Sequence, residues 1–139
     1  MALNSILDGG TVHGCACHAM EHELSAYYDI THGHGLAILT PRWLTYILNE
    51  NTAPAIYRLG IKVFGVQEGL NVTDGAKKAI TALSDFCFDT LGLLPTLTDL
   101  NIDKTHFKEM AEHACTGEVI TGPMELRSED VENIYAMCL

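Results

Sequence analysis

Apolar residues recur at helical spacing in several stretches of the chain, and polar or turn-forming residues divide these stretches. The clearest runs from about Asp74 to Leu91. Thr73 or Asp74 suits the N-terminal cap of this helix, and Gly92 suits its C-terminal cap. Its apolar positions follow one another at steps of four, three, four and four; they are Ala76, Ile80, Leu83, Cys87 and Leu91.

Two other expected helices contain a proline. One covers about 36–48, and Pro41 lies inside it, where proline removes a hydrogen bond and is expected to kink the helix. The other has Pro54 in its first turn, where proline is favoured. The expected apolar side of this helix consists of Ile56, Leu59 and Val63.

Three further helices complete the prediction. The first covers about 12–27, the second is capped by Asp103 and ends before Gly117, and the third begins near Ser128. The apolar residues of the last two are Phe107, Met110 and Ala114, then Val131, Ile134, Tyr135 and Cys138. No stretch alternates convincingly as a strand does. We therefore predict an all-α fold, a bundle of about six helices, in a single domain over residues 1–139.

Charge and composition exclude several classes of function. The 139-residue chain carries 8 basic and 18 acidic residues, a net charge of −10, which disfavours nucleic acids and anionic membranes as partners. No stretch approaches the roughly 20 apolar residues of a membrane span, and the N-terminus does not resemble a signal peptide. The five cysteines, an odd number, favour reduced thiols and a cytoplasmic location.

The histidines carry the candidate chemistry, because five of the seven fall between His13 and His34. His18 and His22 are four residues apart and share one helix face. Gly33 and Gly35 allow a tight return that would bring His32 back toward this face. Imidazole is a common ligand of zinc and iron, so the pattern indicates a metal site. The alternative is that some of these histidines cap helices or make buried hydrogen bonds, which we favour for His13 and His34.

Histidines elsewhere, and two protease motifs, need a separate interpretation. His106 and His113 are expected to be solvated on a polar helix face. The segment 22–26 begins like a zincin motif, but Ala26 stands where the second histidine is required. The segment 18–22 matches the inverted H-x-x-E-H motif of inverzincins, with Glu21 as general base. This motif is short, and no third zinc ligand is evident.

A longer run decides between these readings. The segment 18–46, HAMEHELSAYYDITHGHGLAILTPRWLTY, closely resembles the most recognisable part of the iron-containing alcohol dehydrogenases, particularly of their butanol dehydrogenase-like branch. Residues 86–97, 107–114 and 130–131 resemble the family as well. The resemblance covers essentially the whole chain, and it is most specific in the first third.

The resemblance implies a function and roles for three histidines. The family consists of NAD(P)-linked enzymes that interconvert alcohols and aldehydes, with an N-terminal nucleotide-binding domain and a C-terminal helical domain. Its iron(II) or zinc is held by one Asp and three His. His18 and His32 match the last two of these histidines, and His22 matches an active-site histidine near the nicotinamide that is not usually a ligand. The metal would act as a Lewis acid and the cofactor would supply the hydride.

Several features of the family are missing from this sequence. The first two ligands precede the matching segment in the family, and residues 1–10 offer only Asp8 and no histidine. No glycine-rich phosphate loop occurs. We therefore expect a partial, metal-binding domain without the nucleotide-binding domain, inactive by itself, which binds metal weakly or not at all. Replacement of the lost ligands by Cys15 and Cys17 is a minor alternative.

Two expectations concern partners. Removal of neighbouring helices would expose apolar faces, so we expect a homo-oligomer. The competing functional reading is a stand-alone helical interaction domain that kept the fold and lost catalysis.

Overall fold

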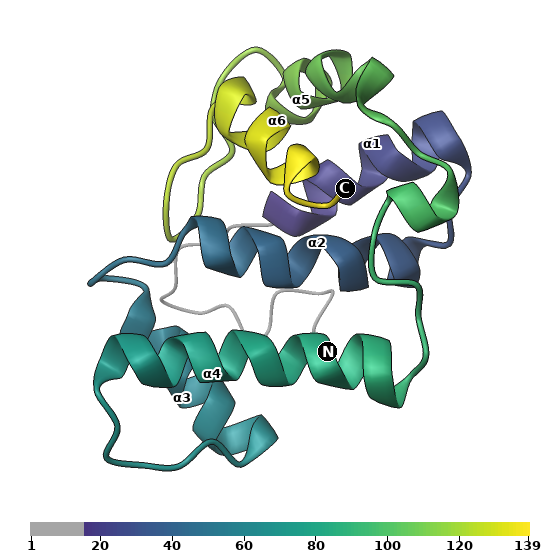
Figure 1. The fold of residues 1–139 in the computed structure, drawn as a ribbon. Helices are drawn as coiled ribbons and strands as arrows, with labels where there is room; N and C mark the ends of the chain where they lie inside the picture. Colours follow the sequence, from purple (N-terminus) through teal and green to yellow (C-terminus); the bar gives the residue numbers. More distant parts are fainter. Residues whose placement is uncertain (1–15) are drawn as a thin grey trace, which may run out of the picture.

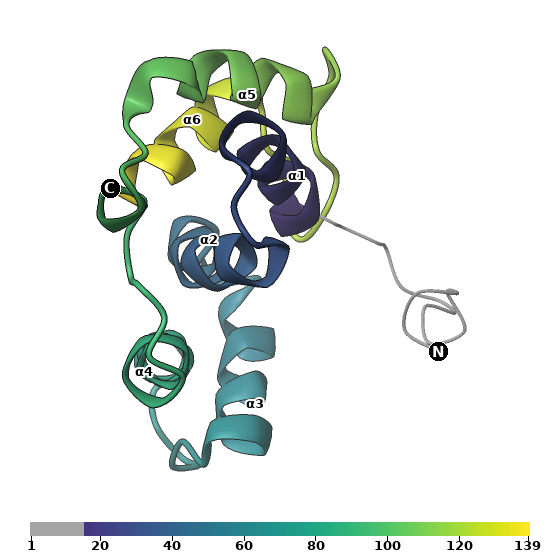
Figure 2. The same cartoon turned by 90° about the vertical axis from the view of Figure 1, so that its right-hand side faces the viewer.

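Helix α2 lies between two layers of helices (Figures 1 and 2). The computed structural model describes residues 16–139, and every regular element in this range is helical apart from a single isolated bridge between Ile120 and Leu126. The predicted all-α fold with about six helices is thus confirmed. The α-helices are α1 (Ala16–Tyr28), α2 (His32–Tyr46), α3 (Ala53–Phe64), α4 (Val72–Asp85), α5 (Phe107–Cys115) and α6 (Ser128–Ala136). None of the described helices is long and apolar enough to cross a membrane.

The first layer consists of α1, α5 and α6: α5 packs on α1 and α6, while α1 and α6 pack on α2. The apolar side predicted for the last helix is confirmed, since Val131, Ile134 and Tyr135 are fully buried. The Tyr135 hydroxyl donates a hydrogen bond of 2.7 Å to the backbone carbonyl of Met20 in α1. This layer therefore fixes α1, the helix that carries two of the candidate histidines, against the C-terminal end of the chain.

The second layer is the pair α3 and α4, which lies on the other side of α2 (Figure 2). The prediction that Pro54 lies in the first turn of α3 is confirmed. The predicted apolar face is wrong in part: Ile56 is buried, but Leu59 is 39% exposed and Val63 is 63% exposed. The buried side consists of Ile56, Tyr57 and Gly60 instead. The Tyr57 hydroxyl donates to the carbonyl of Gln67 and accepts from the N–H of Leu70, and these two bonds hold the buried side against the α3–α4 loop.

The helical segment that begins with α4 extends beyond the end of α4 itself. Its N-cap is Asn71, whose side chain accepts from the N–H groups of Thr73 and Asp74, so the caps expected at Thr73 or Asp74 are wrong by a few residues. The helix continues into a π-helical turn, Phe86–Thr90 (η2). Gly92 follows with φ of 70°, in agreement with its predicted role at the C-terminal end.

The segments around α2 and α5 also differ from the predicted boundaries. Helix α2 begins at His32, ahead of the expected start at 36, and it runs through the buried Pro41. Asp103 does act as a cap, but of a short 3-10 turn, Lys104–His106 (η4), that leads into α5. Between α4 and α5 lies one more 3-10 turn, Thr98–Leu100 (η3). The segment before it contacts α2, since Arg42 donates to the carbonyl of Pro95 at 2.8 Å.

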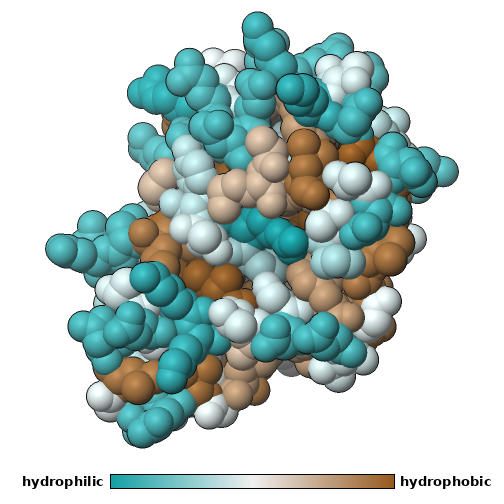
Figure 3. All heavy atoms as spheres, in the orientation of Figure 1, coloured by the Kyte–Doolittle hydropathy of each residue, from teal (hydrophilic) through white to brown (hydrophobic). Residues whose placement is uncertain are grey.

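Apolar side chains reach the surface in several places, as the brown atoms in Figure 3 show for one face. A pocket of about 380 Å³ lies between the end of α2 and α3, lined by Trp43, Leu44, Ile47, Ile56 and Leu59 among others. Other exposed apolar residues of this layer are Val63, Val72, Phe86 and Leu91. The second layer therefore exposes several large apolar side chains and an apolar pocket to solvent.

Candidate metal centre

The turn from α1 to α2 brings three histidines together. Asp29 N–H donates to the carbonyl of Ser25 at 3.0 Å and ends α1, and Asp29 has a φ of 51°. The chain then reverses, and Thr31 precedes the first residue of α2, His32. His18 and His22 lie on one face of α1, and the reversal places His32 beside them. The expectation that these three rings approach one another is therefore met by the structure.

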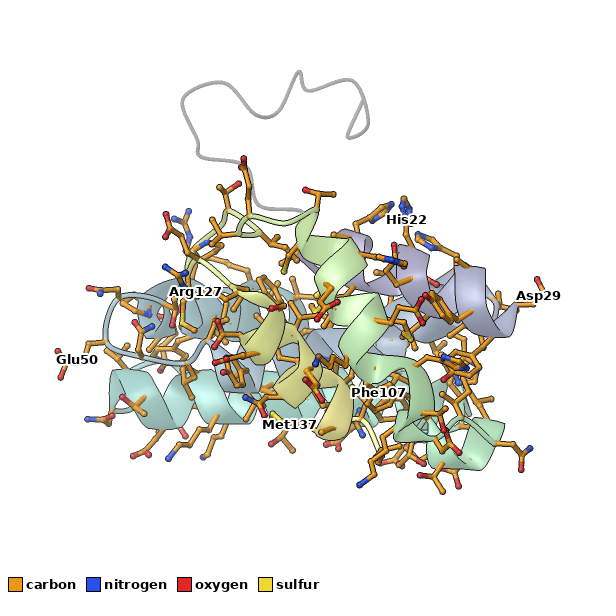
Figure 4. All side chains as sticks on the ribbon, turned by 90° about the horizontal axis from the view of Figure 1, so that it is seen from above. His22, Asp29, Glu50, Phe107, Arg127 and Met137 are labelled. Carbon is orange, nitrogen blue, oxygen red and sulfur yellow. The ribbon has the colours of Figure 1, made fainter. Side chains whose placement is uncertain are left out.

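The three imidazoles form a compact cluster. One ligand atom from each of His18, His22 and His32 lies within 4.8 Å of the others, and the His18 and His32 rings are 4.7 Å apart between centroids. His18 and His22 are exposed, and the side chain of His32 is 43% exposed. Figure 4 shows His22 at the outer edge of the molecule. This is the only group of three potential metal ligands among residues 16–139.

The cluster suits a transition metal. A zinc–imidazole bond is about 2.0–2.1 Å, so two nitrogens on one ion are at most about 4.2 Å apart. The nitrogens of the cluster lie within 4.8 Å of one another, and the exposed His18 and His22 rings have room to rotate toward this separation. Imidazole also suits both iron and zinc. The residues present therefore fit the divalent metal that the resemblance implies, and they supply the nitrogen part of its coordination.

A buried carboxylate lies beneath the cluster. Glu21, in α1 between His18 and His22, is 0% exposed, and its Oε2 contacts Nδ1 of His32. Its other oxygen, Oε1, accepts from the Ser25 hydroxyl at 2.5 Å. Gly35 makes room for this side chain, because a Cβ at that position would lie 2.8 Å from both Cγ and Oε1 of Glu21.

Glu21 is the residue of the site that sequence reasoning missed. The sequence suggested it only as the general base of an inverted zinc-protease motif. A carboxylate that is sealed in the core and held by Ser25 and His32 does not reach a solvent water as that role requires. A signal was available, since Glu21 lies between Met20 and Leu24 of the apolar core and four residues before Ser25.

The remaining histidines lie apart from the cluster. His34 forms a 2.9 Å hydrogen bond to the carbonyl of Leu94, so it has a hydrogen-bonding role as expected, but the bond is exposed and not buried. His106 and His113 are about half exposed and surround Tyr27, and His113 also lies 3.5 Å from Glu23. His13 lies outside the described residues.

The four cysteines of the described range do not complete the cluster. Cys17 precedes His18, but burial raises the pKa of its thiol to about 12, which disfavours the thiolate that a metal requires. Cys87, Cys115 and Cys138 are buried and free, as expected for small apolar residues of the core. Cys15 lies outside the described residues.

Comparison with known proteins identifies the family. Residues 3–139 match the model of the Fe-containing alcohol dehydrogenase family, C-terminal. The chain belongs to this family. It is 40% identical over 137 residues to NADH-dependent butanol dehydrogenase A of Clostridium acetobutylicum, and 32% identical over 120 residues to 1,3-propanediol dehydrogenase of Klebsiella pneumoniae. These alignments cover 97% and 85% of the chain, and 35% and 30% of the relatives.

Solved structures of the family share the fold. The crystal structure of NADH-dependent butanol dehydrogenase A from Thermotoga maritima superposes with a TM-score of 0.83 at 31% identity, over 99% of this chain and 36% of that one. A 1,3-propanediol oxidoreductase gives a TM-score of 0.80 at 29% identity, over 89% of this chain and 32% of that one. The chain thus spans about a third of the length of the relatives that it matches, and its helices correspond to their C-terminal region.

Proposed function

We propose that this chain is the metal-binding helical part of an NAD(P)-linked alcohol dehydrogenase that interconverts small alcohols and aldehydes. One observation carries the proposal: three imidazoles converge within 4.8 Å on one edge of the α1–α2 pair. The names of the relatives support the substrate class, since they include butanol and 1,3-propanediol dehydrogenases. They also support a nicotinamide cofactor, because both NADH- and NADP-dependent proteins are among them.

Within this proposal the three histidines divide their roles. His18 and His32 are metal ligands, and His22 is an active-site residue beside them. When bound, iron(II) or zinc supplies Lewis acidity toward the oxygen of the alcohol or aldehyde. His22 is exposed and next to the ligands, so it can hold or pass on a proton at the oxygen of the substrate.

The chain by itself carries only part of the chemistry in this proposal. A catalytic metal usually has three or more protein ligands, and the described residues offer two assigned ligands and one neighbour. The chain is therefore a single, partial metal-binding domain, and hydride transfer requires a nucleotide-binding part that accompanies it. The resulting expectation is weak metal binding and no dehydrogenase activity for the isolated chain. A cytoplasmic location fits its free cysteines.

Metal titration tests the proposed ligands. We expect zinc or cobalt(II) to bind the 139-residue chain saturably but no tighter than micromolar, and His18→Ala and His32→Ala to abolish this binding. His34→Ala is the matched control, because His34 bonds to Leu94 outside the cluster and its loss should leave the titration unchanged. Sub-micromolar affinity at one site would contradict the proposal that the chain supplies only part of the metal ligands. Binding that survives both His18→Ala and His32→Ala would contradict the assignment of these two histidines as ligands.

A chimaera tests the activity. The chain replaces the matching C-terminal region of butanol dehydrogenase A of Clostridium acetobutylicum, with which it shares 40% identity. We expect NADH-dependent interconversion of butanol and its aldehyde in the chimaera, loss of this activity with His18→Ala or His32→Ala, and its retention with His34→Ala. A folded chimaera that binds metal but shows no activity would favour the alternative of an interaction domain that has lost catalysis.

We also propose that the isolated chain self-associates. Leu59 and Val63 on α3 and Leu91 after α4 are exposed, and the pocket beside α3 is mostly apolar. Apolar surface of this kind drives association in water. Light scattering should give a mass of at least two chains, and a single-chain mass at high concentration would exclude the oligomer.

A further inference from the structure

The contact between Glu21 and His32 bears on which nitrogen of the histidine ring carries the proton. An ionised carboxylate accepts hydrogen bonds and does not donate them, so Glu21 in this form favours a proton on the Nδ1 of His32 that faces it. In a neutral ring the other nitrogen, Nε2, then has a free lone pair. Only a nitrogen with a free lone pair binds a metal, which makes Nε2 the ligand atom of His32.

Burial makes this contact hard to replace. The Oε2 atom of Glu21 is sealed from solvent, makes no hydrogen bond among the described residues, and has Nδ1 of His32 as its close polar contact. A carboxylate oxygen without a polar partner is unfavourable in the core, so the His32 ring is held against it. Oε1 is fixed in turn by Ser25, whose hydroxyl also lies 3.2 Å from the carbonyl of Ile30. The carboxylate is therefore anchored at both oxygens.

Gly35 belongs to the same arrangement. The Glu21 side chain passes beneath the first turn of α2, where a side chain at position 35 would overlap with it. The carboxylate thus lies close to the N-terminal end of α2, where the helix dipole favours negative charge. The packing of α1 on α2 therefore fixes the orientation of the His32 ring in the absence of any metal.

We propose that Glu21 is a positioning residue, which holds the His32 ring in its Nδ1–H form with Nε2 free to bind the metal. The inference rests on the proposed function, because it takes His32 as a ligand. Carboxylate–histidine–metal arrangements of this kind fix the tautomer and orientation of the ligand and raise its basicity, and their loss typically lowers metal affinity about 10–100-fold.

The first test reads the tautomer directly, without metal. Long-range proton–nitrogen NMR spectra of the histidine-labelled chain in alkaline buffer distinguish Nδ1–H from Nε2–H rings, and His32→Gln assigns the signal. We expect the Nδ1–H form in the wild type and a shift toward the Nε2–H form in Glu21→Leu, a variant that fills the same core space without a carboxylate. Ser25 keeps a partner there in the carbonyl of Ile30.

Glu23→Leu is the matched control. Glu23 lies on the same helix and loses the same charge, but it faces His113 outside the cluster. The control should keep the Nδ1–H form of His32. Thermal unfolding of all three proteins checks that each is folded, and Glu21→Leu is expected to melt at or above the wild-type temperature because an apolar side chain replaces a buried carboxyl group.

The second test measures cobalt(II) affinity by visible absorption in the same three proteins. Glu21→Leu should weaken binding about 10–100-fold, while Glu23→Leu should not change it. A wild-type His32 in the Nε2–H form, or an unchanged tautomer or affinity in folded Glu21→Leu, overturns the role of Glu21. Wild-type binding that does not depend on His18 and His32 overturns the proposed function instead, so the two failures are distinguishable.

Discussion

The hydroxyl of Tyr135 donates a hydrogen bond to the backbone carbonyl of Met20, and so ties the last helix of the chain to the first described one. Both side chains are fully buried, and Tyr135 also packs its ring 5.3 Å from that of Phe107 in α5. Met20 lies between His18 and His22 in the sequence. The position of two histidines of the cluster therefore depends on a residue at the opposite end of the chain.

Removal of this hydroxyl should destabilise the chain without unfolding it. Tyr135→Phe keeps the ring and leaves the Met20 carbonyl without its donor, so we expect a loss of about 1–2 kcal/mol in the free energy of unfolding. Urea denaturation measures the loss. Tyr28→Phe is the control: its hydroxyl makes only an exposed 3.4 Å contact to Asp103, and it should change stability by less than about 0.5 kcal/mol. Equal losses in the two variants would contradict the role of the buried bond.

Two glycines of α2 should respond in opposite ways to alanine. Gly35→Ala places a Cβ against Glu21 and should cost about 1–3 kcal/mol, with weaker cobalt binding, because the carboxylate has to move. Gly33→Ala meets no atom within 4 Å and should stabilise the chain by about 0.4–1 kcal/mol, since alanine restricts the unfolded chain. Urea denaturation compares the two, and a tolerated Gly35→Ala would show that Glu21 is not confined as described.

The cap of α4 gives a third prediction. The Asn71 side chain accepts from two N–H groups at the start of the helix, so Asn71→Ala should lower the free energy of unfolding by about 1 kcal/mol. Thr73→Ala, at one of the two residues that the sequence suggested as the cap, should have little effect because Thr73 is exposed and already within the helix. The same denaturation assay decides between the two positions.

Cys138 should make stability fall in alkali. Burial raises the pKa of its thiol from 9.0 to about 12, so the folded chain keeps a proton that the unfolded chain loses above pH 9.0. Stability from this group is therefore complete below pH 9.0 and decreases toward pH 12, by at most about 1.4 kcal/mol per pH unit. Cys138→Ala has no thiol to ionise at this position, so its stability relative to the wild type should rise as the pH exceeds 9.0. A constant difference across this range would refute the shift.

Local patterns predicted most helices because the buried faces are regular. Ala76 and Ile80 in α4, and Val131 and Ile134 in α6, repeat at helical steps and are buried as expected. The boundaries were less predictable, because they depend on single side-chain contacts. The N-cap of α4 is Asn71, before the expected positions, because its side chain accepts hydrogen bonds from the start of the helix. The pattern of apolar residues does not predict such bonds.

Tertiary contacts decided what the sequence left open or missed. Leu59 and Val63 fit an apolar helix side as well as Tyr57 does, and only the packing of α3 on α4 shows that Tyr57 is turned inward. The histidines were found from spacing and from the family resemblance. Glu21 was not, because a charged residue in a helix is ordinarily solvated, and its burial depends on space left by Gly35 in the next helix.

The histidine cluster comes from two consecutive helices, so its residues are close together along the chain. An ion shared by His18 and His32 would close a short loop, which costs little chain entropy and needs no part of α3 or α4. It would slow amide hydrogen exchange in α1 and α2, while the α3–α4 pair would exchange as it does without metal. The ion would therefore stabilise the α1–α2 pair directly and the α3–α4 pair only through its packing on α2.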